Sequence, residues 1–178
     1  MRKIVLTFGL IAGAILSAMM FLTVPFQDQI GFDKGAIIGY TTMVLAFLMV
    51  FVGVRSYRDN VAGGRVTFGR AFKVGLLIVA VASACYVATW QLVYYKLAPD
   101  FVDKYTAHVV EQQRASGATP EQLAKRQRQM AQFKEMYSNP LVNIAFTLLE
   151  PLPVGLVFTL LTAGVLSRKR KANSAAVA

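Results

Sequence analysis

The sequence contains few of the residues that form disulfides and metal centres. Its 178 residues include one cysteine, Cys85, and one histidine, His108. A single cysteine excludes a disulfide within the chain, and the two residues form no zinc-type spacing. His108 with Met130 and Met136 is a weak soft-metal candidate, because such residues on an amphipathic segment usually pack against apolar neighbours. We therefore expect no metal and no cofactor.

Acidic residues are also scarce. The chain has 9 Asp and Glu against 19 Lys and Arg, and its formal net charge is +10. Such a charge can indicate nucleic-acid binding, but the basic residues here cluster at the ends of apolar runs, where the positive-inside rule of membrane proteins puts them. We therefore expect no nucleic-acid partner. The expected partner is the lipid bilayer, with its anionic headgroups on the cytoplasmic side.

Long apolar runs are abundant, and 56% of the residues are hydrophobic. Four runs are long enough to cross about 30 Å of hydrocarbon as helices: residues 4–24, 36–54, 74–97 and 140–166. The first follows two basic residues, as in a signal peptide, but it is long for one and lacks a clear cleavage site. We predict an all-α membrane protein with four transmembrane helices in a single domain, residues 1–171, and a disordered tail, 172–178.

One long polar stretch, residues 99–138, separates the third and fourth runs. Its first half has apolar residues near helical spacing. A second helix start follows, in which Thr119 is the N-cap, Pro120 the first helical residue and Gln122 the partner in a capping box. The stretch therefore predicts an amphipathic helical hairpin, whose apolar stripes must bury against each other, the membrane surface or a partner.

Basic residues predict the orientation. The loop after the second run carries Arg55, Arg58, Arg65, Arg70 and Lys73, and a second basic block follows the fourth run. Both groups belong in the cytoplasm, which puts both termini inside and the hairpin outside. Loop residues 65–73 also mix basic and aromatic side chains. Two interpretations stay open: an amphipathic segment that contacts anionic headgroups, or a loop that merely fixes the topology.

Glu150 is the one charged residue inside the fourth run. It lies about 15 Å from the start of that span, where a charge is costly unless it is protonated, paired or in a wet cavity. Pro151 and Pro153 remove the helical hydrogen bonds to the carbonyls of Thr147 and Leu149. A proline also pushes the residue before it away from helical torsions. We therefore expect the helix to kink or break at Glu150.

Other polar side chains lie at a similar depth in the remaining spans. Counting turns from the span ends brings three residues near the level of Glu150: Tyr86, Ser17 and Thr42. We predict that they form an intramembrane polar cluster with Glu150. This prediction uses depth alone, because the sequence does not give the rotation of each helix about its axis.

Small residues recur with a spacing of four in the first two runs. Gly9 and Gly13 form one Gly-x-x-x-Gly pattern, and Gly35 and Gly39 form another. Such faces let two helices approach closely. Packing within the chain is the favoured interpretation, and a contact between two copies is the alternative.

Four segments together resemble a known family. They are residues 55–59, the Gly-Gly-x-x-x-Phe-Gly pattern at 63–69, Asn139–Pro140, and the Glu-Pro-Leu-Pro turn at 150–153. This combination resembles a bacterial membrane-protein family catalogued as domain of unknown function forty-one ninety-nine. The resemblance covers nearly the whole chain. It implies a four-helix protein of the bacterial inner membrane with a helical extracytoplasmic insertion, and it implies no activity and no catalytic residue.

Three classes of function are compatible with these patterns. The sequence favours a small scaffold or assembly subunit that contacts a membrane-protein partner or a second copy, because of its small-residue faces and its hairpin. The alternative is a subunit of a proton- or ion-coupled transporter or channel that uses Glu150. An enzyme that modifies lipids is the least favoured, because Glu150 has no second acid or histidine at its depth.

Overall fold

The structure is a computed structural model that describes residues 1–168, and its regular elements are all helices. No strand is present among these residues. Four helical stretches are long and apolar enough to cross a membrane: Arg2–Ile30, Phe32–Asn60, Phe68–Leu97 and Pro140–Leu166. The predicted all-α class with four membrane-spanning helices is therefore confirmed. The tail predicted at 172–178 lies outside the described residues.

The helices extend well beyond the apolar runs that predicted them. The first stretch contains α1 (Arg2–Thr23), η1 (Val24–Phe26) and α2 (Gln27–Ile30), so it continues past the apolar run at 4–24. Only Gly31, with φ +83°, separates α2 from α3 (Phe32–Asn60). The third stretch is α4 (Phe68–Leu92), which continues as the π-helical η2 (Val93–Leu97).

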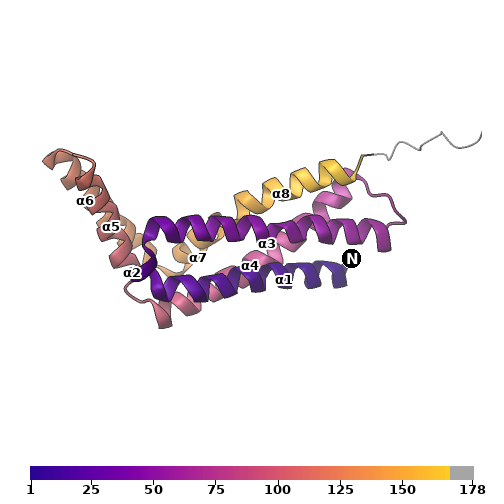
Figure 1. Cartoon of the computed structure of the whole chain (residues 1–178), viewed down its shortest axis with the longest axis horizontal. Coiled ribbons are helices and arrows are strands. Elements are labelled where there is room, and N and C mark those ends of the chain that lie inside the picture. The colour runs from indigo at the N-terminus through magenta and orange to yellow at the C-terminus, as the bar shows by residue number, and fades with distance from the viewer. Residues whose placement is uncertain (169–178) are drawn as a thin grey trace, which may run out of the picture.

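The bundle is organised around α4. Helix α1 packs on one side of it and α8 (Pro151–Leu166) on another, while α3 contacts all three. Phe47 and Met43 of α3 and Ile78 of α4 are among the largest side chains buried in the core. Figure 1 shows α1, α3 and α4 running side by side along the long axis of the molecule.

Glycines permit two of these contacts. A methyl group on Gly13 of α1 would lie 2.7 Å from Cβ of Cys85 on α4, and one on Gly9 would lie 2.6 Å from Cβ of Val81. A methyl group on Gly155 of α8 would lie 2.5 Å from Cγ1 of Val79. Two carbon atoms cannot approach this closely, so a side chain at these positions would clash. The glycines therefore let α1 and α8 pack directly against α4.

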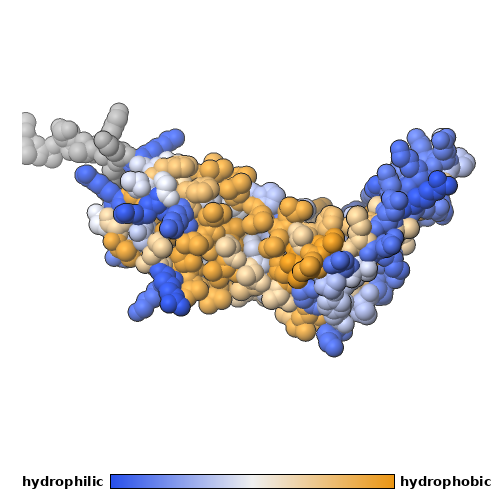
Figure 2. All heavy atoms as spheres, turned by 180° about the vertical axis from the view of Figure 1, so that it is seen from behind, coloured by the Kyte–Doolittle hydropathy of each residue, from blue (hydrophilic) through white to orange (hydrophobic). Residues whose placement is uncertain are grey.

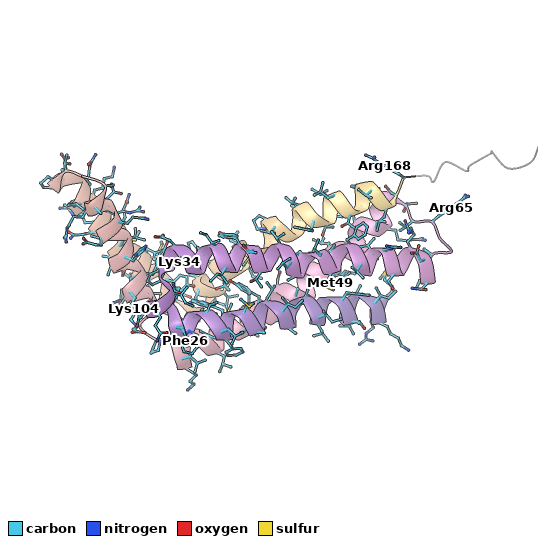
Figure 3. All side chains as sticks on the ribbon, viewed as in Figure 1. Phe26, Lys34, Met49, Arg65, Lys104 and Arg168 are labelled. Atoms are coloured by element: carbon cyan, nitrogen blue, oxygen red, sulfur yellow. The ribbon has the colours of Figure 1, made fainter. Side chains whose placement is uncertain are left out.

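The two ends of the bundle differ. The N-terminus, the α3–α4 loop and the last turn of α8 lie together at one end, and Figure 3 places Arg65 and Arg168 there. Lys34 and Lys104 mark the opposite end. Between them, Figure 2 shows apolar side chains along the face of the bundle that it presents, with hydrophilic residues gathered at both ends. This distribution fits a bundle that crosses a bilayer.

Helices α5 (Phe101–Ala115) and α6 (Pro120–Tyr137) form a pair that projects from that second end (Figure 1). Thr119 caps α6, because its hydroxyl accepts from the Gln122 amide while the Gln122 side chain accepts from the Thr119 amide at 2.9 Å. The pair contacts the bundle through Lys104, whose Nζ lies 2.5 Å from Oδ2 of Asp28.

The five basic residues after the second span occupy helix ends more than a loop. Arg55 and Arg58 lie in the last turns of α3, and Arg70 and Lys73 lie in the first turns of α4. Most of the segment 65–73 forms the start of α4, which begins at Phe68. The reason is a helix cap, since the Thr67 hydroxyl accepts from the Arg70 amide at 3.4 Å.

Candidate functional site

The fourth span breaks at Glu150. Helix α7 (Pro140–Leu149) ends just before it, and Pro151 begins α8. Glu150 itself keeps helical torsions, with φ −76° and ψ −56°. Our expectation that Pro151 would push it out of the helical region is therefore wrong. The break arises from the hydrogen bonds that the two prolines cannot make, which leaves the carbonyls at this turn without their helical donors.

Glu150 and Tyr86 are in direct contact. The Tyr86 hydroxyl on α4 donates to Oε2 of Glu150 at 2.6 Å. The two side chains differ in exposure: Tyr86 is buried, with 9% of its surface accessible, whereas Glu150 is exposed. Tyr86 is the one side-chain donor to Glu150 within residues 1–168. The Tyr86 hydroxyl therefore anchors the carboxyl group through Oε2.

The structure does not bring the other two proposed cluster members to Glu150 in the same way. Thr42 lies on the wall of the cavity that Glu150 also lines, but its hydroxyl donates to the Ile38 carbonyl at 2.8 Å. Ser17 is engaged elsewhere, because its Oγ lies 2.7 Å from Oγ1 of Thr89 between α1 and α4. Depth along a helix gives the level of a side chain, and rotation about the axis decides its neighbours.

A cavity of about 730 Å³ lies beside Glu150. Its walls come from helices α1 to α7 and from η1, at the end of the bundle that carries the α5–α6 pair. Gly39 belongs to this wall, since a methyl group there would meet nothing within 4 Å, and Gly35 sits beside the Gln27 side chain. The second Gly-x-x-x-Gly pattern thus borders a cavity, whereas Gly9 and Gly13 contact α4.

Aromatic rings surround the cavity. Trp90 and Phe101 meet edge to face with ring centroids 5.0 Å apart, and Phe146 packs against Phe133 at 5.9 Å. Tyr40 of α3 is on the wall and 53% exposed. These rings come from α3, α4, α5, α6 and α7, so the α5–α6 pair contributes to the site instead of lying apart from it.

Two charged or titratable groups stand at the outer part of the cavity. His108 of α5 and Asp33 of α3 both line it, and Nε2 of His108 lies 3.5 Å from Oδ1 of Asp33. A second cavity of about 370 Å³ shares both residues with the first. Polar groups therefore extend from the end of the bundle to Glu150.

A family described as Protein of unknown function (DUF4199) matches residues 7–168. The chain belongs to this family. The match includes most of the first span, the other three spans, the α5–α6 pair and the break at Glu150, so the resemblance noted in the sequence is confirmed. Neither the search of curated proteins nor that of solved structures returns a match. Membership in DUF4199 gives the chain a family but no activity.

One polar contact of this DUF4199 chain was missed by the sequence reasoning. Gln91 on α4 donates through Nε2 to Oδ1 of Asn143 on α7 at 2.7 Å, and Asn143 is completely buried. The signal was available, because a buried amide inside an apolar run needs a partner. This bond fixes α7 against α4 and so positions Glu150 relative to Tyr86.

The arrangement is suited to binding. No group of three His, Cys, Asp or Glu side chains within residues 1–168 could hold a metal ion. The titratable groups on the cavity wall are Glu150, Asp33, His108 and several tyrosines. Glu150 can accept a hydrogen bond, exchange a proton or pair with a cation from the cavity, while Tyr86 holds it in place.

Proposed function

We propose that the protein is a subunit of a small proton- or ion-coupled transporter in which Glu150 is the intramembrane binding group. One observation supports this above all: a glutamate about 15 Å into an apolar span lines a cavity of about 730 Å³. A carboxyl group at that depth requires water, a proton or a ligand. Helices broken beside such a group are a recurrent feature of transport sites.

The sequence alone favoured a scaffold over a transporter subunit. The packing of α1 reverses this ranking. A scaffold in the membrane needs a small-residue face that is free for a partner. Gly9 and Gly13 are instead in contact with α4 of the same chain. Gly39 borders the cavity. The features that suggested an interaction subunit are therefore already used within the protein.

A scaffold role is kept as the second candidate because of one feature, the α5–α6 pair. It projects beyond the bundle and is mostly polar on its outer side (Figures 1 and 2). A partner protein at the membrane surface could contact it there. Native mass spectrometry after gentle extraction tests this: a discrete heteromeric complex supports the scaffold, and a homo-oligomer or monomer supports transport.

A lipid-modifying enzyme is the least supported class. Acid–base catalysis requires convergent groups within hydrogen-bond reach of the reacting atoms. Tyr86 is the one side chain that bonds to Glu150 in the described residues, and it is buried behind the carboxyl group. Turnover of a lipid by the purified protein would overturn this ranking.

The proposed location is the bacterial inner membrane, with both termini in the cytoplasm. The basic residues gathered at the end that holds the N-terminus support it, because positive charge is retained on the cytoplasmic side. Arg55, Arg58 and Arg65 belong to that end as well, and we propose that they contact anionic headgroups there. The α5–α6 pair and the mouth of the cavity then face the other side.

The test is a flux assay in proteoliposomes. Purified wild-type protein is reconstituted, a pH gradient is imposed, and proton movement is followed with an entrapped pH-sensitive dye. Glu150→Gln keeps the size and the hydrogen bond from Tyr86 but cannot ionise, so we expect it to abolish the flux. Glu135→Gln is the matched control, because Glu135 is exposed on α6 and away from the cavity wall. Equal flux in wild type and Glu150→Gln would refute the transport proposal.

A further inference from the structure

We propose that the cavity beside Glu150 binds an amphipathic organic cation, that is, an amine or ammonium group attached to an apolar body. The inference uses the same site as the proposed function and names the class of its ligand. It concerns binding, so it can hold whether or not the ligand is carried across the membrane. Charge, wall chemistry and size each support it.

The charge of the wall is opposite to that of the chain. The protein has 19 Lys and Arg and a net charge of +10. Yet no Lys or Arg of residues 1–168 lines the cavity, whereas the carboxyl groups of Glu150 and Asp33 do. Glu150 has one oxygen held by Tyr86, and it lines the open space. In a medium of low dielectric, such a carboxylate attracts a cation strongly and repels an anion.

The rest of the wall suits an organic cation better than a metal ion. Nine aromatic residues line it, among them Tyr40, Trp90, Phe101, Tyr105, Tyr137 and Phe146. Ring faces attract ammonium groups through cation–π interactions, which strengthen when the cation is desolvated. Three methionines, Met19, Met20 and Met43, add an apolar surface that adapts to different shapes.

The size of the cavity also favours an organic cation over a metal ion. About 730 Å³ falls within the range of pockets that enclose small organic molecules. A bare alkali ion would leave most of that apolar wall unfilled and would meet few oxygen ligands. An apolar body fills the aromatic part while its positive group reaches Glu150, so both halves of the wall are used.

The single tryptophan makes binding measurable. Trp90 is the only tryptophan in the chain, and it lies on the cavity wall. The probes are tetraphenylphosphonium and tetraphenylborate, which have nearly the same shape and opposite charge. Each is titrated into the full-length protein in a nonionic detergent while Trp90 fluorescence is recorded. We expect saturable quenching by the phosphonium and only weak, non-saturable quenching by the borate.

Two variants connect this binding to the wall. Glu150→Gln should weaken phosphonium binding roughly tenfold, because it removes a charge-assisted contact. Tyr40→Leu, which keeps the carboxylate and changes an exposed ring, should weaken it about threefold. Glu135→Gln should leave it unchanged. Equal binding of both probes, or equal phosphonium binding in wild type and both wall variants, would overturn the inference.

Two further experiments complete the test. The first identifies the source of the cation, and the second tests the cation site and the transport function separately. Displacement of the phosphonium by soluble phenethylamine indicates a free amine as the ligand, and displacement only by phosphatidylethanolamine in mixed micelles indicates a lipid headgroup. Binding that depends on Glu150 without any flux in proteoliposomes supports the cation site and refutes transport. Flux that depends on Glu150 without phosphonium binding supports transport and refutes the cation site.

Discussion

Gly9 and Gly39 are chemically the same residue in very different surroundings. A methyl group on Gly9 would lie 2.6 Å from Cβ of Val81, whereas one on Gly39 would meet nothing within 4 Å. We expect Gly9→Ala to lower the free energy of unfolding by about 1–3 kcal/mol, because α1 must move away from α4. Gly39→Ala should be neutral or stabilise by up to about 1 kcal/mol, since alanine favours the helix. Thermal unfolding in detergent, followed by circular dichroism, measures both.

The same two variants also test whether the Gly9 face of α1 contacts α4 of the same chain or a second copy of the protein. If the Gly9 face served a second copy instead of α4, Gly9→Ala would change the oligomeric state and leave the unfolding of the monomer nearly intact. Size-exclusion chromatography with light scattering would detect that change. A destabilised protein of unchanged mass is the result that the packing against α4 requires.

The break between α7 and α8 depends on two residues, Pro151 and Pro153, that lack a backbone amide hydrogen. Replacing both Pro151 and Pro153 by alanine restores the donors, so we expect the two helices to join into a straighter one. Spin labels on Leu141→Cys and Leu161→Cys, both exposed sites, report the change in a Cys85→Ala background. A straight helix would separate these backbone positions by about 30 Å.

In the protein with both prolines the labels should lie closer than in the double-alanine form. The straightened helix would also move the carboxyl group of Glu150 relative to Tyr86, so binding of tetraphenylphosphonium should weaken with it. Identical distance distributions in the two proteins would show that packing against α4, and not the prolines, sets the bend.

The contact between α2 and α5 rests on Lys104. A hydrogen bond to Asp28 is the main cause that raises the pKa of Lys104, and a hydrogen bond to Lys104 is the main cause that lowers the pKa of Asp100. The lysine contribution is complete below its ordinary value of 10.5 and is lost as pH rises through the raised one. The aspartate contribution is complete above 3.8 and is lost as pH falls through the lowered one.

Both contributions are therefore constant between about pH 5 and pH 9. We expect Lys104→Met to speed the amide hydrogen exchange of α5 by the same factor at every pH in this range, each time relative to wild type. Added salt should reduce the difference, because the group is exposed. Lys125→Met on α6 is the control, since no ion pair of Lys125 is found in the described residues. A ratio that varies between pH 5 and pH 9 would contradict the assignment.

Much of the architecture could be predicted from apolar runs, caps and prolines, because these are local properties. The capping box at Thr119 and the break at Glu150 are found where the sequence places them. The predictions that fail are those about which residues of different helices lie next to each other. Ser17 lies at a suitable depth but faces Thr89, and Gly39 has helix-contact spacing but faces a cavity. Rotation of a helix is decided by packing across the whole bundle, which no local pattern contains.

The cavity could not be predicted for the same reason. Its wall combines residues from helices α1 to α7, and two of these, α5 and α6, come from the polar segment between the third and fourth spans. What the sequence does contain is its chemistry: one carboxylate in an apolar span and an excess of aromatic residues near the third and fourth spans. Only the fold gathers them around one space and leaves the basic residues outside it.

The distribution of charge over the protein predicts its orientation. Val61, in the α3–α4 connection, lies at the end that carries the basic residues, and Ser116 lies at the tip of the α5–α6 pair. In a Cys85→Ala background, we expect Ser116→Cys to react with a membrane-impermeant maleimide in intact spheroplasts. Val61→Cys, which is exposed, should react only after lysis.

The outcome also decides from which side the cavity is reached. Asp33 and His108, which line the cavity, lie in the first turn of α3 and in α5, at the end of the bundle that carries Ser116. Labelling of Ser116→Cys from outside means that a cation meets Glu150 from the extracytoplasmic side, down a gradient of potential that draws positive charge inward. The reverse labelling would contradict the predicted topology and make the cytoplasm the source of the ligand. In detergent, tetraphenylphosphonium reaches both ends of the protein. The binding measurement therefore does not depend on the orientation in the membrane, and the two are tested independently.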